Sequence, residues 1–334
     1  MITVVLSVYN TGKYLPKAMN SIMNQTFTDF EVIIVDDGST DGSDKICEQE
    51  KAGRDNVRVF HKPNGGLSSA RNFGIKHANG SFIIFPDPDD WVEPGYLEKL
   101  YGLSKKADLA VCGHFDEMDG KRRAWNQGAK SCILDNEKAM EILMMPNAFC
   151  GYAWNKLYRL SVIKENDLRF DTELGMVQDL HFAVRYFQKI KTVAYNPVPL
   201  YHYNHDSGGV TASYSPLTPR KISGLLTYKK IGEMTEKDYP RVAELAYSSL
   251  CNMCLQDIYI YYRSGMKDKE VLKYLKETFL KYKRYYAKST EYRRSNKMFM
   301  NLVSVSPRLY AFLTRMKKII LNRLDRKRKN AWRE

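Results

Sequence analysis

At 334 residues, 44% of them hydrophobic, the chain can bury one large core and still supply a second domain or an appendage. The chain has 52 basic residues (Lys and Arg) and 38 acidic residues (Asp and Glu). Residues 220–334 hold 28 of the basic and 11 of the acidic residues, which leaves 24 basic and 27 acidic residues in residues 1–219. The net charge of +14 therefore argues against a uniformly basic nucleic-acid-binding protein and indicates a nearly neutral body with a basic C-terminal region.

The first 115 residues alternate short β-branched runs with longer amphipathic stretches. The expected strands are Thr3–Val8, Phe30–Val35, Val57–Phe60, Phe82–Phe85 and Asp108–Cys112. This alternation predicts βαβ units and a mostly parallel sheet. The first intervening helix should bury a stripe made of Leu15, Ala18, Met19 and Ile22.

Polar clusters follow three of these strands, at Tyr9-Asn10, at Asp36–Ser39 and at Asp87–Asp90. Ligands of parallel sheets bind beyond the carboxyl ends of the strands. We therefore expect the three clusters to lie along one edge of the sheet.

Two of the loops that follow strands are ambiguous by themselves. In Asp36–Gly42, a carboxylate could accept the ring N–H of a uracil or bind a ribose hydroxyl, but the segment also suits an ordinary strand-to-helix turn. The glycines of Asn64–Gly74 resemble a phosphate loop, yet the segment lacks a Walker A lysine and a complete dinucleotide fingerprint. Arg71 within it could hold a phosphate or a carboxylate of the Asp87 cluster.

The segment Asp87–Asp90, called the acid loop below, is the strongest chemical signal. An apolar strand delivers three carboxylates within four residues, and such a cluster repels itself unless a cation lies nearby. Mg²⁺ and Mn²⁺ favour carboxylate oxygens supplemented by substrate phosphates. The acid loop thus predicts a Mn²⁺ or Mg²⁺ site completed by a nucleotide diphosphate.

Taken together, these segments resemble the inverting family-two glycosyltransferases, which have the GT-A fold. The resembling residues are Leu6–Asn10, Ser21–Thr26, Asp29–Asp41, Gly66–Gly74 and Asp87–Trp91. The resemblance is strong to residue 115, fair to residue 211 and negligible beyond. It implies an α/β fold with a Rossmann-like nucleotide-binding sheet, followed by a mixed acceptor lobe and by the helical, basic C-terminal region.

The resemblance also implies roles for residues of the first domain. The nucleotide and donor contacts would be Ser7, Tyr9, Asp37, Arg71 and Asp87, with Asp37 as the uracil-binding acid. The direct metal ligand would be Asp89 or Asp90, and the sequence does not decide between them.

In the second lobe, Trp154–Tyr158 is similar to a recurrent family segment, and Gln178-Asp179 matches a Glu-Asp pair at a helix start. By that match Asp179 is the general base. A carboxylate at a helix N-terminus stays ionised, and partial burial restores some basicity, although a helix-capping Asp would look the same. Three further residues are candidate diphosphate or acceptor contacts: Lys156, Gln178 in place of the family's Glu, and His205 where the family has arginine. If His205 does not bind the diphosphate, the metal alone would carry the leaving group.

The six cysteines are scattered, which is typical of a reduced cytoplasmic protein. Cys251 and Cys254 form one close pair, but helical apolar spacing and the lack of a second ligand pair favour core packing over zinc. The apolar N-terminus lacks the features of a signal peptide, and no window reaches the roughly 20 apolar residues that span a bilayer. We expect a soluble or membrane-surface protein.

The last helix should begin at Ser306-Pro307. Its apolar stripe consists of Leu309, Phe312, Leu313, Met316 and Ile320. Basic residues flank the stripe, and the run Arg326–Lys329 follows it. This composition predicts an interfacial helix that binds an anionic membrane surface, while the alternative is a helix packed on the protein body with a solvated basic tail.

Residues and resemblance together predict three regions: a nucleotide-sugar-binding domain at 1–115, an acceptor and catalytic lobe at 116–216 and a membrane-associating region at 217–334. The expected function is an inverting, metal-dependent hexosyl- or N-acetylhexosaminyltransferase that uses a UDP-sugar. Its acceptor would be a saccharide, linked to polyprenyl diphosphate, for capsule or exopolysaccharide synthesis at the inner face of the plasma membrane.

Two alternatives remain open. A nucleotidylyltransferase or retaining transferase would also use a nucleotide-binding α/β domain, but a nucleotidylyltransferase normally has a Gly-rich basic loop where this chain has Tyr9–Lys13. A nucleic-acid-binding protein could use the Tyr-, Lys- and Arg-rich C-terminal region, but it would leave the acid loop unexplained. We therefore expect no nucleic-acid partner.

Overall fold

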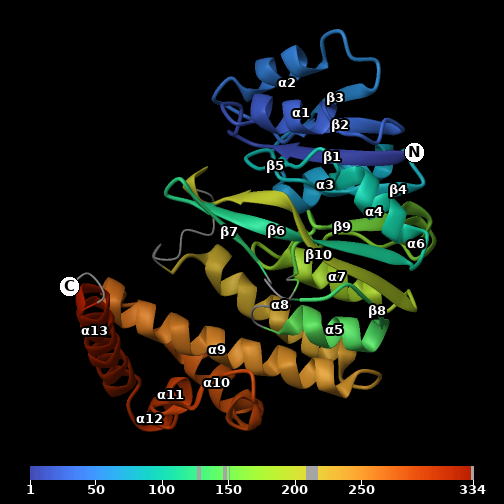
Figure 1. The fold of residues 1–334 in the computed structure, drawn as a ribbon. Helices are drawn as coiled ribbons and strands as arrows, with labels where there is room; N and C mark the ends of the chain where they lie inside the picture. The colour runs from blue at the N-terminus through green and yellow to red at the C-terminus, as the bar shows by residue number, and fades with distance from the viewer. Residues whose placement is uncertain (126–128, 146–148, 150, 208–216, 332–334) are drawn as a thin grey trace. The chain divides into compact units, whose positions relative to one another are not determined.

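The computed structural model describes residues 1–125, 129–145, 149, 151–207 and 217–331, with side chains described as far as residue 320. The chain forms two compact units, unit 1 (Met1–Ala212) and unit 2 (Ser213–Glu334), shown in Figure 1. Unit 1 carries the sheet, and unit 2 is helical in its described residues.

Within its described residues, unit 1 is built on a ten-stranded mixed sheet. The spatial order is β3 (Val57–His61), β2 (Phe30–Asp36), β1 (Ile2–Val8), β4 (Phe82–Ile84), β9 (Lys156–Arg159), β6 (Leu109–Met118), β10 (Thr192–Asn204) and β5 (Trp91–Val92), with β7 (Lys121–Ala124) beside β6 and β8 (Cys132–Asp135) beside β10. The first four strands are mutually parallel, as predicted.

The parallel half of the sheet forms because its strands are apolar on both faces. Every residue of β1 and of β2 is buried. Helices cover this sheet, and α1 (Leu15–Met23) buries the predicted stripe of Leu15, Ala18, Met19 and Ile22. Since β1 lies between β2 and β4, the loops that follow these strands share one edge, which confirms the expected convergence.

The other helices of unit 1 connect these strands or pack against them. They are α2 (Ser43–Lys51), α3 (Leu67–His77), α4 (Tyr96–Ser104), α5 (Asn136–Met144), α6 (Leu160–Glu165) and α7 (Gln178–Phe187), with a 3₁₀ turn at His205–Ser207.

The sheet continues through the boundary predicted at residue 115. That position falls inside β6, which pairs with β9 on one side and with the parallel β10 on the other. β9 in turn pairs antiparallel with β4 and so joins the two halves. Residues on both sides of position 115 therefore belong to one continuous sheet.

Unit 2 has a core of its own, rich in tyrosine. Its helices are α8 (Pro219–Thr235), α9 (Pro240–Ser264), α10 (Lys269–Lys288), α11 (Arg294–Lys297), α12 (Leu302–Val305) and α13 (Pro307–Ala331). Tyr247 and Tyr282 stack with ring centroids 4.5 Å apart. Cys251 and Cys254 are buried in the same core as free thiols, and burial raises the pKa of Cys251 to about 12, so the pair packs as predicted.

Helix α13 begins where the sequence indicates, and the Ser306 hydroxyl accepts a hydrogen bond from the Leu309 N–H at 3.2 Å. Four members of the predicted apolar stripe, Leu309, Phe312, Met316 and Ile320, are exposed. Phe312 is 58% exposed. Among the described residues, no helix is both long enough and apolar enough to cross a membrane.

We expect Gly74→Ala to destabilise unit 1, because a Cβ at this position of α3 would lie 2.4 Å from Val5 Cγ1 on β1. The helix would have to move away from the sheet, at a cost of about 1–3 kcal/mol in the free energy of unfolding. Urea denaturation measures this loss. Gly102→Ala on α4 is the control: nothing lies within 4 Å of its Cβ, and it should gain about 0.5–1 kcal/mol. Equal effects of the two changes would contradict the packing argument.

Asp257 on α9 should make unit 2 less stable as the pH rises. It is 4% exposed, and its Oδ2 has no hydrogen-bond partner among the described residues. Burial raises its pKa to about 7, with Lys221 opposing the shift. Between the ordinary carboxyl pKa of about 4 and about 7, the folded state binds a proton that the unfolded state has lost, so the free energy of unfolding falls across this window.

Asp257→Asn removes the charge that must be desolvated. At pH values above the window it should raise the free energy of unfolding by roughly 2–4 kcal/mol and flatten its pH dependence. Denaturation at a series of pH values, with the exposed Asp238→Asn as control, tests this. An unchanged pH dependence in Asp257→Asn would show that this carboxyl does not titrate in the folded state as described.

Candidate active site

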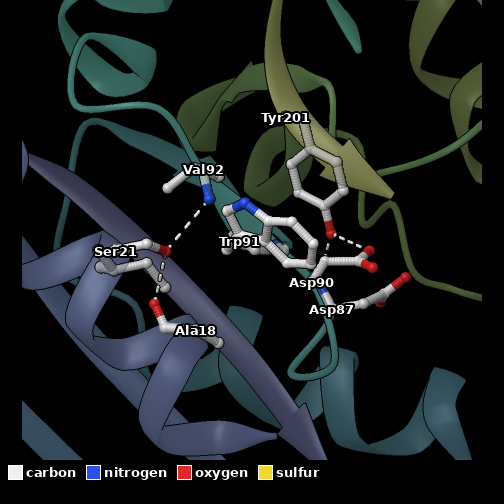
Figure 2. A pocket seen from close by; sticks show the side chains of 9 residues that line it. Ala18, Ser21, Asp87, Asp90, Trp91, Val92 and Tyr201 are labelled. Carbon is white, nitrogen blue, oxygen red and sulfur yellow. Dashed lines mark hydrogen bonds between the residues drawn. The ribbon is translucent and has the colours of Figure 1, made fainter. Parts of the chain in front are cut away.

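The acid loop is held in place by a tyrosine that the sequence analysis missed. Tyr201 on β10 accepts a hydrogen bond from the Asp87 N–H at 3.0 Å and donates its hydroxyl to Asp90 Oδ2 at 2.5 Å, as Figure 2 shows. The Asn204 N–H donates to the other oxygen, Asp90 Oδ1, at 2.8 Å. Both oxygens of Asp90 are therefore occupied, and the residue is only 2% exposed.

The end of the acid loop is also anchored to α1. The Ser21 hydroxyl accepts a hydrogen bond from the Val92 N–H at 3.1 Å and donates to the Ala18 carbonyl at 2.7 Å. The small pocket between α1 and the acid loop, drawn in Figure 2, has no room for a water molecule. The loop is thus packed on its α1 side.

These contacts distinguish the two candidate metal ligands. Burial, together with Asp87 and Asp89, raises the pKa of Asp90 well above its ordinary value. Asp89 is half-buried, and its carboxylate accepts no hydrogen bond from a described residue. Of the two carboxylates, only that of Asp89 is open to a ligand.

A buried arginine joins the acid loop to the second lobe, a contact called the Arg71 bridge below. Arg71 on α3 is 1% exposed, and its Nη2 lies 2.9 Å from Asp87 Oδ1 while its Nη1 contacts Asp179 Oδ1. The Phe170 ring lies 5.2 Å from the guanidinium. Burial alone would lower the pKa of Arg71, but the two carboxylates outweigh it and raise the pKa. Arg71 was expected to hold a phosphate or a carboxylate of the acid loop, and in the structure it holds the carboxylate of Asp87.

The Arg71 bridge only partly compensates the cost of burying the Asp87 carboxylate. Desolvation raises the pKa of Asp87 to about 7, Arg71 opposes this shift, and Asp89 and Asp179 add to it. A further positive charge at the acid loop would favour the ionised carboxylate.

Asp179 lies in the first turn of α7, but it does not cap the helix. Its Oδ2 accepts a hydrogen bond from the Ala153 N–H at 3.2 Å, and its Oδ1 is held by Arg71. The alternative of a helix-capping Asp is therefore not what the structure shows. Val177, just before the helix, has φ of 62°, which is strained for a β-branched residue and is the kind of strain that accumulates at functional sites. The Asp179 side chain is 17% exposed, so part of it reaches solvent.

The Trp154 segment contacts both Tyr201, which holds the acid loop, and Asp179. The Trp154 ring stacks on Tyr201 with centroids 4.1 Å apart and on Tyr152 at 4.7 Å. Ala153, between these aromatic residues, makes the hydrogen bond to Asp179. One aromatic stack thus supports both the acid loop and the predicted base.

At the nucleotide end, Ser7 and Tyr9 lie at the end of β1, as predicted. The Ser7 hydroxyl is buried with no hydrogen-bond partner among the described residues, whereas Tyr9 is 49% exposed. Asn10, next to Tyr9, accepts a hydrogen bond from the Thr40 N–H at 2.8 Å, which ties the loop after β1 to the loop after β2.

Asp37 has a different environment from the one expected of an open uracil ligand. The residue is 2% exposed, and its carboxylate contacts Lys62 Nζ and accepts hydrogen bonds from the N–H groups of Gly65 (3.1 Å) and Gly66 (2.7 Å). In this structure Asp37 joins the end of β2 to the glycine loop before α3. Lys62 was missed because its charge has no partner nearby in the sequence.

Two of the three candidate contacts are held by other residues. Lys156 is fully buried, and its Nζ donates to the Tyr152 carbonyl and to Asn155 Oδ1, and its role as a ligand contact stays a prediction. His205 Nε2 lies 2.8 Å from Asp116 Oδ1 instead of contacting the acid loop. Gln178 is 8% exposed in the first turn of α7, next to Asp179.

The family model described as "Glycosyl transferase family 2" matches residues 3–166. The putative glycosyltransferase EpsH of Bacillus subtilis is 34% identical over 234 residues, which cover 68% of this chain and 67% of EpsH. Glycosyltransferase GlyG of Streptococcus pneumoniae is 33% identical over 226 residues, which cover 63% of this chain and 72% of GlyG.

Solved structures show the same fold. TarS 1-349 of S. aureus, in complex with UDP-GlcNAc, has a TM-score of 0.64 at 17% identity, covering 93% of this chain and 89% of that one. The mannosyltransferase PcManGT of Pyrobaculum calidifontis, in complex with GDP-Man and Mn²⁺, has a TM-score of 0.54 at 12% identity, with 94% and 86% covered. The fold is thus GT-A, and by its sequence relatives the chain belongs to glycosyl transferase family 2.

Proposed function

We propose that this glycosyltransferase inverts the anomeric centre of a UDP-sugar and transfers a hexosyl or N-acetylhexosaminyl group to a saccharide acceptor. The observation that carries the proposal is the Arg71 bridge, which holds Asp179 beside the acid loop. That arrangement puts a carboxylate suited to proton abstraction next to carboxylates suited to a cation that would bind the donor diphosphate.

Asp179 is proposed as the general base. It would accept the proton of an acceptor hydroxyl while that oxygen bonds to the anomeric carbon, from the face opposite the departing diphosphate. The old bond from the anomeric carbon to the diphosphate breaks in the same step, so the configuration inverts. Contacts from Arg71 and the Ala153 N–H orient the carboxylate before the acceptor arrives.

Asp87 and Asp89 are the residues proposed to hold Mn²⁺ or Mg²⁺. No group of three or more His, Cys, Asp or Glu side chains in the described residues could hold a metal without help. Two adjacent carboxylates, with that of Asp89 open, nevertheless fit a hard cation that completes its coordination with substrate oxygens. When bound, the cation would neutralise the charge that develops on the departing diphosphate.

The UDP part of the donor is proposed to bind at the ends of β1 and β2. Support comes from the exposed Tyr9 ring and from the buried Ser7 hydroxyl, which has no hydrogen-bond partner among the described residues. Asp37 would bind the uracil ring as predicted, or would position the glycine loop to which it is hydrogen-bonded. The TarS complex, which contains UDP-GlcNAc, supports a UDP-sugar as the donor.

The acceptor is proposed to be a saccharide linked to polyprenyl diphosphate, used for a cell-surface polysaccharide at the cytoplasmic face of the membrane. Support comes from α13, where exposed apolar side chains lie among basic residues, and from the basic run that follows in the sequence. Membership in a family of glycosyltransferases favours glycosyl transfer over nucleotidylyl transfer.

We expect Asp179→Asn to lower the rate of nucleoside diphosphate release in the presence of acceptor by roughly 10²–10⁴-fold, because an amide cannot accept the proton. Donor affinity, measured by calorimetry, should change little. The exposed Asp55→Asn is the control and should keep the wild-type rate. A folded Asp179→Asn protein that binds donor and turns over at the wild-type rate would exclude Asp179 as the base.

Membrane contact through α13 should depend on its exposed apolar face. Replacing both Phe312 and Ile320 by serine should weaken binding to vesicles containing anionic lipid at least about tenfold, because each buried apolar side chain contributes roughly 1.5–3 kcal/mol. Ile133→Ser, a change at a 57% exposed residue of unit 1, is the control. Vesicle co-sedimentation measures the partition, and equal binding by all three proteins would rule out this contact.

A further inference from the structure

A histidine outside the proposed chemistry lies at the centre of a stack of rings in unit 1. His202 on β10 is 1% exposed. Its imidazole is nearly parallel to the Trp91 ring on one face, at 5.0 Å and 10°, and to the Phe115 ring on the other, at 4.9 Å and 23°. The two aromatic rings come from β5 and β6, so the stack joins three strands.

Both ring nitrogens of His202 face carboxylates. Nδ1 lies 2.8 Å from Glu117 Oε1, and Nε2 lies 2.9 Å from Glu93 Oε1. A neutral imidazole has one N–H and one lone pair, so it could satisfy only one of these carboxylates and would point its lone pair at the other. An imidazolium has two N–H groups and satisfies both.

The outer charges of the stack are cations. Lys17 Nζ of α1 lies 2.8 Å from the centroid of the Trp91 ring, and the Arg122 guanidinium of β7 lies 5.0 Å from that of Phe115 while its Nε contacts Glu117 at 2.6 Å. Arg122 Nε and His202 Nδ1 therefore share one acceptor, Glu117 Oε1. The charged groups that contact His202 directly are the two carboxylates.

The stack lies where the acid loop ends. In the antiparallel pairing of β10 with β5, His202 is opposite Trp91, and Tyr201 is opposite Val92. β5 has only these two residues, and they follow Asp90 directly. Tyr201, the neighbour of His202, is the side chain that holds Asp87 and Asp90.

We propose that His202 is a positioning residue, present as an imidazolium, that fixes β5 against β10 and so sets the acid loop in the shape that receives the donor diphosphate. The consequence for the donor rests on the proposed function, whereas the protonation of His202 does not. His202 touches neither the donor nor the reacting atoms, and it acts through Trp91 and Tyr201.

The first test is spectroscopic. Long-range ¹H–¹⁵N correlation of the histidine rings, on full-length protein at neutral pH, should show both nitrogens of His202 protonated. His77, whose contacts are the aromatic rings of Phe60 and Phe73, is the internal comparison. A single protonated nitrogen on His202 would overturn the proposal, and this readout holds even if no nucleotide sugar is ever found to bind.

The second test separates positioning from packing by kinetics. His202→Gln should raise the KM for the nucleotide sugar about tenfold while kcat stays within about twofold, because the acid loop loosens and Asp179 does not. His77→Gln is the matched control and should leave both constants unchanged. If His202→Gln fails to fold, the partly exposed Glu93→Gln should show a smaller rise in KM.

The possible results separate the positioning role of His202 from the proposed glycosyl transfer. A folded His202→Gln or Glu93→Gln protein with wild-type KM would overturn the positioning role. A fall in kcat with unchanged KM would also overturn it. Wild-type protein that releases no nucleoside diphosphate from any sugar donor would instead refute the proposed function, and the protonation of His202 would still be decided by the spectrum.

Discussion

The candidate site depends on one buried cation shared by two carboxylates. Arg71 has almost no exposed surface, so an unpaired guanidinium there would be very costly, and Asp87 and Asp179 together offset that cost. Because the guanidinium is planar and binds with two separate arms, it fixes direction as well as charge. The second lobe therefore cannot shift relative to the acid loop without breaking a buried ion pair.

Much of the fold could be predicted because it follows from local patterns. Apolar runs without alternation located β1, β2 and β4, and the spacing of apolar residues located the buried face of α1. The convergence of the polar loops followed from parallel pairing alone. For Asp179, the match to a family motif gave the position, and the structure added its contacts with Arg71 and Ala153.

The rest of the site depends on partners that are distant in sequence. Nothing local reveals that Tyr201 binds Asp90, so the sequence could not tell that Asp90 is buried and Asp89 open. Lys156 was a candidate because its segment is similar to a recurrent family segment, and the structure adds that β9 carries it into the sheet, where it is fully buried. The boundary predicted at residue 115 fell inside β6 for a similar reason, since strand pairing across the sheet leaves no mark on composition.

The Arg71 bridge is tested most directly by the rate of nucleoside diphosphate release catalysed by Arg71→Lys. Lysine keeps the positive charge but cannot reach two carboxylates with two fixed arms. If the bridge positions the base relative to the donor, the folded variant should lose about 10²-fold or more in kcat. A folded Arg71→Lys protein with the wild-type kcat would show that charge alone suffices and would contradict this account.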